Sequence, residues 1–335
     1  MAGPDLLFVS YSGLLGGAER VLLDAVTRIE RPLVVACPDG PLADALREAG
    51  IAHAGVAERP LKVGLAHMAG VAALARDIRR LKPEFVVAWG ARAVLAARLE
   101  SRPWLAVHHD LLPGRAIRAV VKAASKDANG VAAASQAIAR QIGKRVTVLH
   151  PGVDLDRFTP RPRPDGPPKV LVLGALVAWK RPELALEIAK RLPEAHVTIA
   201  GTTLPGDDGG LERRLRAEAG PNVTIAGPID DVPQALAEHH VLLHCADEEP
   251  YGMVLVEALA AGRPVVAPNA GGPREILAEG LYPPGDAAAA ADGIERALAD
   301  PQAGARARRR AEEHFDVRTS TRRLEEAICR AMPSS

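Results

Sequence analysis

Residues 245–262 read Cys-Ala-Asp-Glu-Glu-Pro-Tyr-Gly-Met-Val-Leu-Val-Glu-Ala-Leu-Ala-Ala-Gly, and this stretch decides the fold class of the chain. It follows a short apolar run, Val241–His244, of the kind that forms a buried strand. Pro250 and Gly252 interrupt the chain, and a helix is predicted from about Met253 to Ala261. A strand, a loop and a helix in this order form part of a βαβ unit, which indicates a parallel sheet.

Two carboxylates mark this stretch as a candidate site. The predicted helix is apolar on almost every side except at Glu257, and an ionised carboxylate in such surroundings needs a partner. Glu249 stands just before the loop, at the carboxyl end of the strand, where open α/β sheets bind their ligands. Free N–H groups near Gly252, Met253 and Val254 suit a phosphate. The stretch therefore predicts a site for a sugar and a phosphate.

The same alternation of strand-like runs and helix-period segments extends along nearly the whole chain, which predicts doubly wound α/β domains. Residues 159–169 contain five prolines among eleven residues and form a stiff linker. We therefore predict a first domain at 1–160 and a second at 165–316, with a helix at about 317–332 that packs back on the first. One large sheet with a surface loop is the less favoured alternative. The strand-like runs are Leu6–Ser10, Leu33–Ala36, Phe85–Trp89, Trp104–His108, Val131–Ala134, Val146–Leu149, Lys169–Leu173, His196–Ala200, Val223–Ala226, Val241–His244 and Pro264–Ala267.

The composition is that of a globular protein, with 48% hydrophobic and 25% charged residues. Three scattered cysteines argue against a disulfide framework or a zinc site, and no apolar run is long enough to span a membrane. The first residues lack the basic leader of a signal peptide, so we expect a cytoplasmic protein. Residues 1–160 carry 21 Lys and Arg against 15 Asp and Glu, a balance too mild and too poor in aromatics for nucleic acid.

A glycine loop follows the first predicted strand. Gly16 and Gly17 open a helix, so backbone N–H groups there can approach an anion closely. The spacing matches neither the dinucleotide-binding fingerprint nor the P-loop. From this loop alone, a phosphate site and a simple chain turn are equally good interpretations.

The spacing of Glu249 and Glu257 around Pro-Tyr-Gly-Met, followed by Ala-Leu-Ala-Ala-Gly-Arg-Pro-Val-Val-Ala, resembles the Glu-x7-Glu signature of family 4 retaining glycosyltransferases. Members have the GT-B fold, in which two Rossmann-like domains face each other across a cleft that holds the active site. Other segments resemble the family in the same order, and these are the glycine loop at 16–20, the end of the first domain at 148–158 and the loop Gly174–Lys180.

The resemblance implies roles for residues on the donor side. Glu257 would hold the ribose hydroxyls, Glu249 would contact hydroxyls of the donor sugar, and Lys180 would hold the diphosphate. Ala175 stands where the family usually has an arginine, so half of the expected cationic clamp is absent and Arg181 is the candidate to replace it. The full donor-binding set is Gly16, Gly17, Lys180, Arg181, Glu249, Tyr251, Gly252, Met253, Val254 and Glu257.

The resemblance also places a histidine of the first domain at the donor's anomeric region. His109 matches best, at the end of the strand Trp104–His108, and it joins Glu249 and Lys180 as a predicted catalytic residue. The adjacent His108 is the alternative, because successive strand residues face opposite ways. Further candidates on the acceptor side are His108, Asp110 and Arg115.

Residues 115–126 form a predicted amphipathic helix in the first domain. One face carries Arg115, Arg118, Lys122 and Lys126, which we interpret as a solvated face in preference to a membrane-binding patch. The opposite face, made of Ile117, Val120, Val121 and Ala124, is apolar enough to join the core.

The reaction that the resemblance implies is transfer of a sugar from a nucleoside diphosphate to an acceptor hydroxyl, with the anomeric configuration kept. We expect UDP as the nucleotide with GDP as the alternative, a small-molecule acceptor, and no cofactor or metal. A non-catalytic or weakly active sugar-nucleotide-binding partner of another transferase and a sugar-nucleotide epimerase of the same fold are the alternatives.

Overall fold

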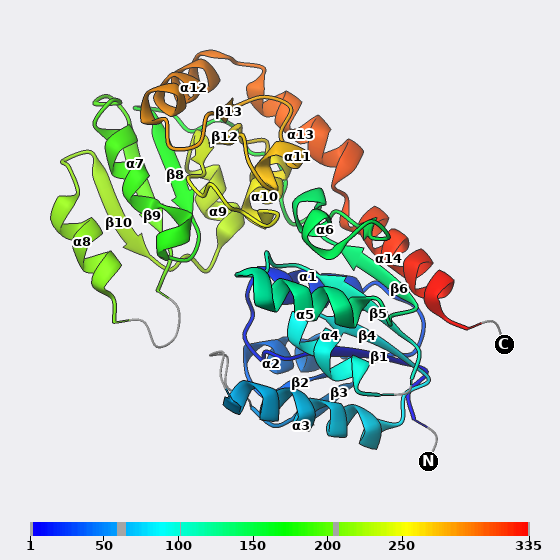
Figure 1. Cartoon of the computed structure of the whole chain (residues 1–335). Coiled ribbons are helices and arrows are strands. Elements are labelled where there is room, and N and C mark those ends of the chain that lie inside the picture. The colour runs from blue at the N-terminus through cyan, green and yellow to red at the C-terminus, as the bar shows by residue number, and fades with distance from the viewer. Residues whose placement is uncertain (1–2, 59–64, 101, 204–207, 334–335) are drawn as a thin grey trace. The chain divides into compact units, whose positions relative to one another are not determined.

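The chain folds into two compact units, and the computed structural model describes residues 3–58, 65–100, 102–203 and 208–333. The first unit runs to Gly152 and resumes at Val317, while the second is continuous from Val153 to Asp316. Each unit is a parallel sheet with helices packed on it (Figure 1). The predicted class, two doubly wound α/β domains, is therefore confirmed.

In the described part of the first unit, seven parallel strands lie in the order β3-β2-β1-β4-β5-β6-β7. The three central strands, β1, β4 and β5, are buried along their whole length, which is why each is a continuous apolar run in the sequence. The strands are β1 (Leu6–Ser10), β2 (Val34–Pro38), β3 (His53–Val56), β4 (Phe85–Trp89), β5 (Trp104–His108), β6 (Gly130–Ala133) and β7 (Thr147–Val148).

Helices cover both faces of this sheet. Leu22 of α1, Leu46 of α2 and Leu324 of α14 belong to the core on one face. Leu74 of α3 and Val94 of α4 belong to the core on the other, together with part of α5. The helices are α1 (Gly17–Val26), α2 (Pro41–Glu48), α3 (Leu65–Leu81), α4 (Ala91–Arg98), α5 (Arg115–Ser125), α6 (Gln136–Ile142) and α14 (Val317–Ala331).

In the described part of the second unit, six parallel strands lie in the order β10-β9-β8-β11-β12-β13. The last strand, β13, is fixed to its sheet through Tyr282, whose hydroxyl donates a hydrogen bond to the His244 carbonyl oxygen (2.8 Å). The strands are β8 (Lys169–Leu173), β9 (His196–Ala200), β10 (Val223–Gly227), β11 (Val241–Leu243), β12 (Val265–Pro268) and β13 (Leu281–Tyr282).

The helices of the second unit also bury one side each. Ile188 of α7, Leu215 of α8 and Ile294 of α12 share one core with the sheet. The helical elements are the 3₁₀ turn η1 (Ala178–Lys180), α7 (Pro182–Ala189), α8 (Gly210–Glu218), α9 (Val232–Ala237), α10 (Met253–Ala260), α11 (Pro273–Ile276), α12 (Ala287–Ala299) and α13 (Ala303–His314). Among the described helices, none is both long and apolar enough to cross a membrane.

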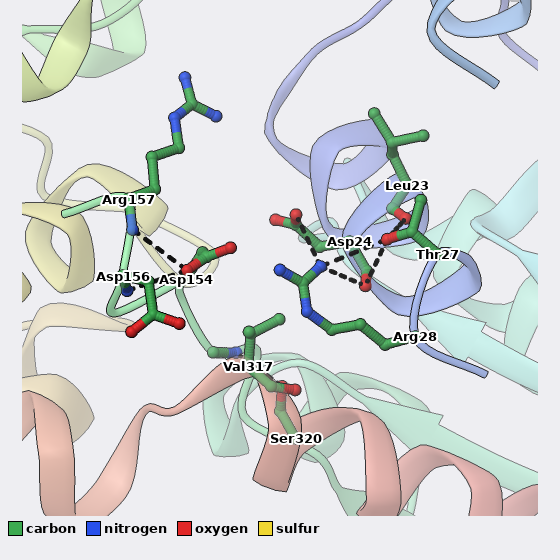
Figure 2. A network of polar contacts seen from close by, with 10 residues as sticks. Leu23, Asp24, Thr27, Arg28, Asp154, Asp156, Arg157, Val317 and Ser320 are labelled. Atoms are coloured by element: carbon green, nitrogen blue, oxygen red, sulfur yellow. Dashed lines mark hydrogen bonds and ion pairs between the residues drawn. The ribbon is translucent and has the colours of Figure 1, made fainter. Parts of the chain in front are cut away.

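The chain passes from the first unit to the second after Gly152, before the proline-rich segment. Residues just beyond this point pack within the second unit, where the Val153 N–H donates to the Phe315 carbonyl (2.8 Å) and Asp154 caps a turn by accepting from the N–H of Asp156 (2.9 Å). The chain returns at Val317, where the Ser320 hydroxyl donates to the Val317 carbonyl (3.0 Å). These turns are drawn in Figure 2.

Both sheets have a topological switch point, where strand order reverses and loops diverge. It lies between β1 and β4 in the first unit and between β8 and β11 in the second. Ligands of open α/β sheets bind outside the carboxyl ends of such strands. The loops after these four strands are therefore the places to look for a site.

Candidate functional site

At the switch point of the second unit, a lysine and a glutamate meet. Lys180 ends the turn η1 in the loop after β8, and Glu249 lies in the loop after β11. Lys180 Nζ lies 2.9 Å from Glu249 Oε2 and 4.7 Å from the centre of the Trp179 ring. The glutamate is 6% exposed and the lysine side chain is 20% exposed, so the pair is a partly buried ion pair at the carboxyl edge of the sheet.

His244 is the second partner of the same carboxylate. Its Nε2 lies 3.2 Å from Glu249 Oε2, although among the described residues this nitrogen has no hydrogen bond of good geometry. Burial alone would raise the pKa of Glu249, but His244 and Lys180 outweigh burial and lower it to about 2. Glu249 is thus ionised near pH 7, and both of these contacts are made by its Oε2.

Arg181 forms a separate ion pair with Asp247. This contact is the main cause that raises the pKa of the Arg181 guanidinium. The backbone of Arg181 is left-handed, with φ at 49°, and this turns its side chain toward the Asp247 loop while Lys180 points to Glu249. The structure therefore does not place Arg181 beside Lys180 as a second cation on one anion.

The loop before α10 is fixed by close backbone packing. Gly272 donates its N–H to the Glu249 carbonyl (2.9 Å), and a Cβ at position 272 would overlap the Tyr251 carbonyl oxygen. Tyr251 is 4% exposed, which makes it part of the core of this loop. Its buried side chain supports the loop from within.

Helix α10 begins directly after this loop. Gly252, its N-cap, has φ at 106° and supplies no side-chain cap. Its carbonyl accepts the Leu255 N–H (3.0 Å), so the N–H groups at the start of the helix that could meet a ligand are those of Met253 and Val254. Met253, Val254 and Glu257 are half-buried, whereas Leu255 and Val256 are buried. One face of α10 thus stays open, and it carries the Glu257 carboxylate.

In the first unit, the two predicted histidines lie in different surroundings. His108 ends β5 and is buried, with Nε2 3.0 Å from the Ser125 hydroxyl. His109 lines a cavity of about 450 Å³ beyond the carboxyl ends of β1, β4 and β5, and its ring stacks on Trp89 with centroids 4.2 Å apart. Burial lowers the pKa of His109 to about 3, with His108 adding to the effect. His109 is therefore neutral at pH 7, and it is the member of the pair that faces a cavity.

The glycine loop of the first unit carries its own carboxylate. Gly16 is the N-cap of α1, and the Glu19 carboxyl folds back over it, in the position where a Cβ of residue 16 would be 3.0 Å from Oε2. Burial raises the pKa of Glu19, and Asp110 adds to the rise, while backbone N–H groups of Glu19 and Gly16 oppose it. Glu19 and Asp110 line the cavity with His109, whereas the exposed Arg115 does not.

Helix α5 differs from expectation on its apolar side. Val121 and Ala124 are buried, as predicted, but Ile117 is half-buried and Val120 is 56% exposed. The prediction that all four join the core is wrong, because Ile117 and Val120 line the cavity instead.

Three residues of these sites received no role from the sequence, namely His244, Asp247 and Trp89. A histidine at the end of a buried apolar strand, five residues before a glutamate, was the available signal for His244. Asp247 and Trp89 carried no comparable signal, because their contacts depend on loop geometry and on the neighbouring strand.

Comparison with known proteins agrees with this arrangement. Residues 156–314 match the family described as glycosyl transferases group 1, and residues 15–157 match glycosyltransferase family 4. A D-inositol 3-phosphate glycosyltransferase from Mycolicibacterium smegmatis is 32% identical over 154 residues, which are 41% of this chain and 35% of that protein. A phosphatidyl-myo-inositol mannosyltransferase from Mycobacterium leprae is 32% identical over 168 residues, 46% of this chain and 44% of the relative.

These matches span less than half the length of either relative. The fold is also similar to that of HepE from Anabaena in complex with UDP and glucose, with a TM-score of 0.84, 23% identity, and coverage of 97% of this chain and 99% of HepE. The two family matches adjoin each other and together run from residue 15 to residue 314. The chain therefore belongs to the family 4 glycosyltransferases and has the GT-B fold.

Proposed function

We propose that this protein is a retaining glycosyltransferase that moves a sugar from a nucleoside diphosphate, UDP in the first instance, to an acceptor hydroxyl. The observation that carries the proposal is the partly buried Lys180–Glu249 pair at the switch point of the second unit, beside the open face of α10. A leaving diphosphate develops negative charge, and Lys180 together with the N–H groups of Met253 and Val254 at the start of α10 would stabilise it.

The electrostatics define what Glu249 can do. A carboxylate whose pKa is lowered to about 2 is too weak a base to take a proton from an alcohol near pH 7. Its proposed role is to accept a hydrogen bond from a donor-sugar hydroxyl through Oε1. The acceptor proton then passes to the departing phosphate, which leaves on the same face as the incoming oxygen.

His109 would act as a neutral group. With its pKa lowered to about 3, it offers a neutral imidazole at the end of β5, so it cannot serve as a general acid near pH 7. It is proposed to form a hydrogen bond with the sugar or the acceptor. Glu257, on the open face of α10, is proposed to hold the ribose hydroxyls.

Calorimetric binding of UDP, GDP, ADP, dTDP and NAD tests the donor site. We expect one nucleoside diphosphate to bind to the wild type with micromolar affinity. We expect this binding to be lost in Glu257→Ala. Glu187→Ala is the matched control, because Glu187 is an exposed glutamate on α7 of the same unit. Binding of NAD alone, or equal binding to both variants, would contradict the proposal. Turnover of the matching sugar nucleotide that persists in EDTA would support a metal-independent reaction.

Ala175 favours a second candidate, a weakly active or non-catalytic sugar-nucleotide-binding partner. Arg181 is engaged with Asp247, so Lys180 is the cation that this loop directs to the Glu249 site. Diphosphate binding with no turnover, and a gain of turnover in Ala175→Arg, would favour this candidate.

A further inference from the structure

The cavity of the first unit has walls of two kinds. The wall at the strand ends and at the residues that follow them carries the polar groups Ser10, His109 and Asp110, and Glu19 of α1 also lines it. The walls contributed by α4, α5 and the loop between His109 and α5 are mainly apolar and include Leu95, Leu111 and Ile117. The volume of about 450 Å³ falls within the ~300–1,000 Å³ of small-molecule sites.

Part of the apolar wall is not covered by the packed core. Leu95, Leu111 and Ile117 stay half-buried, and Val120 and Met68 are 56% and 59% exposed. A single exposed apolar side chain is ordinary, but here several surround one hollow. Their apolar surface is in contact with water, and a ligand bound in the cavity would cover it.

A few polar groups are available to orient such a ligand. His109 directly follows β5, and its Nε2 is buried without a hydrogen-bond partner among the described residues. The Arg92 guanidinium lies 5.4 Å from the centre of the Tyr11 ring, where it borders the same cavity. Many apolar contacts with few polar ones are typical of a site for a molecule that is itself amphipathic.

We propose that the acceptor carries its hydroxyl on an apolar body, aromatic or alkyl, which the walls from α4 and α5 cover while the hydroxyl lies toward His109. Only the identification of the bound compound as the acceptor rests on the proposed function. The binding site for an amphipathic hydroxyl compound stands on the cavity itself.

Binding of n-octyl β-D-glucoside below its micelle concentration, compared with methyl β-D-glucoside, tests the site without any donor. Each buried methylene group contributes roughly fourfold in affinity, so burial of three gives about 60-fold tighter binding of the octyl compound. Because no sugar nucleotide is present, failure of this experiment is distinct from failure of the transferase proposal, which is judged by diphosphate binding.

Helix α5 offers a matched pair of variants. Ala116 and Ala119 are both exposed, but Ala116 lines the cavity and Ala119 does not. We expect Ala116→Trp to fill the cavity and to lose at least tenfold in octyl glucoside affinity, and Ala119→Trp to bind like the wild type. Equal affinity for the two glucosides, or an unchanged Ala116→Trp, would overturn the proposal.

The apolar body can belong to a free compound or to a lipid, and a further measurement separates these sources. Phosphatidylcholine vesicles that contain dodecyl glucoside are sedimented with the wild type and with Ala116→Trp. Co-sedimentation that depends on the glucoside and on an open cavity indicates a lipid acceptor. Binding of monomeric octyl glucoside without co-sedimentation indicates a free one, and both results support the site.

Discussion

Lys180 Nζ and Glu249 Oε2 lie 2.9 Å apart, although 69 positions separate the two residues in the sequence. Their loops follow β8 and β11, which are neighbours only because the strand order reverses between them. The lysine is thus neutralised by protein before any ligand binds. A bound diphosphate has to share this cation with Glu249. Binding of the leaving group is therefore linked to the position of Glu249, the carboxylate that is proposed to hold the sugar.

Replacement of the lysine tests this linkage. Lys180→Met leaves the buried Glu249 carboxylate with His244 alone, so its pKa rises and its ionised form is destabilised. We expect a loss of about 2–3 kcal/mol in unfolding free energy, below the ~3–5 kcal/mol for a fully buried pair because the lysine is partly solvated. UDP affinity, measured by calorimetry, should fall at least tenfold. Lys190→Met, at an exposed lysine in the same unit, should change neither quantity. Unchanged UDP affinity in Lys180→Met would remove Lys180 from the donor site.

His244 is expected to position Glu249 toward the sugar. His244→Phe keeps an aromatic ring, slightly larger than imidazole, but removes the nitrogen 3.2 Å from Oε2. We expect UDP itself to bind within about threefold of the wild type, while the extra affinity of the sugar nucleotide over UDP is lost and kcat falls roughly tenfold (~1.4 kcal/mol).

The conservative variant His244→Gln should recover part of kcat, which a purely structural role would not predict. His196→Phe is the control, since His196 begins β9 at the opposite, amino end of the sheet. Equal losses of UDP and sugar-nucleotide binding in His244→Phe would argue for general disruption of the loop.

Gly17 distinguishes the two interpretations of the glycine loop. It is the first residue of α1, and a Cβ there would meet nothing within 4 Å. Gly17→Ala should therefore stabilise the helix by about 0.5–1 kcal/mol in thermal unfolding. If a phosphate approaches this backbone, as we predict, the added methyl group should reduce turnover despite the greater stability. Full turnover in a stabilised variant would show that the glycine serves only the turn.

Two histidines of the first unit make stability fall in acid. His108 and His109 have pKa values lowered to about 4 and about 3, so both stay neutral in the folded protein well below pH 6.5. The unfolded chain takes up those protons at about pH 6.5, and acid therefore favours unfolding by roughly 1.4 kcal/mol per pH unit for each group.

Between pH 7 and pH 5 this amounts to about 2 kcal/mol for each histidine. We measure the free energy of unfolding in urea at the two pH values by tryptophan fluorescence. We expect the difference between pH 7 and pH 5 to be about 2 kcal/mol smaller in His109→Gln than in the wild type. His314→Gln, at a residue whose side chain is 52% exposed, should keep the wild-type pH dependence. The same dependence in His109→Gln would show that His109 titrates normally in the folded state.

Central strands could be predicted from the sequence because burial on both faces makes them continuous apolar runs. The run predicted at Phe85–Trp89 is β4, and the run at Trp104–His108 is β5. The two strands that were missed, β3 and β13, lie at the edges of their sheets. Edge strands are less covered and need no such run, and β3 includes a half-buried histidine and an exposed glycine.

The candidate site was predictable in its residue types but not in its contacts. The helix after Gly252 and its half-buried glutamate followed from the local pattern, and α10 begins at Met253 as predicted. The ion pairs of Lys180 with Glu249 and of Arg181 with Asp247 did not follow from it. They depend on the order of β8 and β11 and on the left-handed backbone of Arg181, which no short stretch of sequence encodes.

The discontinuous first unit has a consequence for synthesis of the chain. Leu324, Ala327 and Ile328 of α14 belong to the same core as Phe8 and Leu105, yet the ribosome makes them only after all of residues 153–316. The continuous second unit can complete its fold while the part of the first sheet that α14 covers, at β5 and β6, is still an uncovered apolar face. During translation the part made first is thus the part finished last, and that uncovered face is the surface that a chaperone would protect.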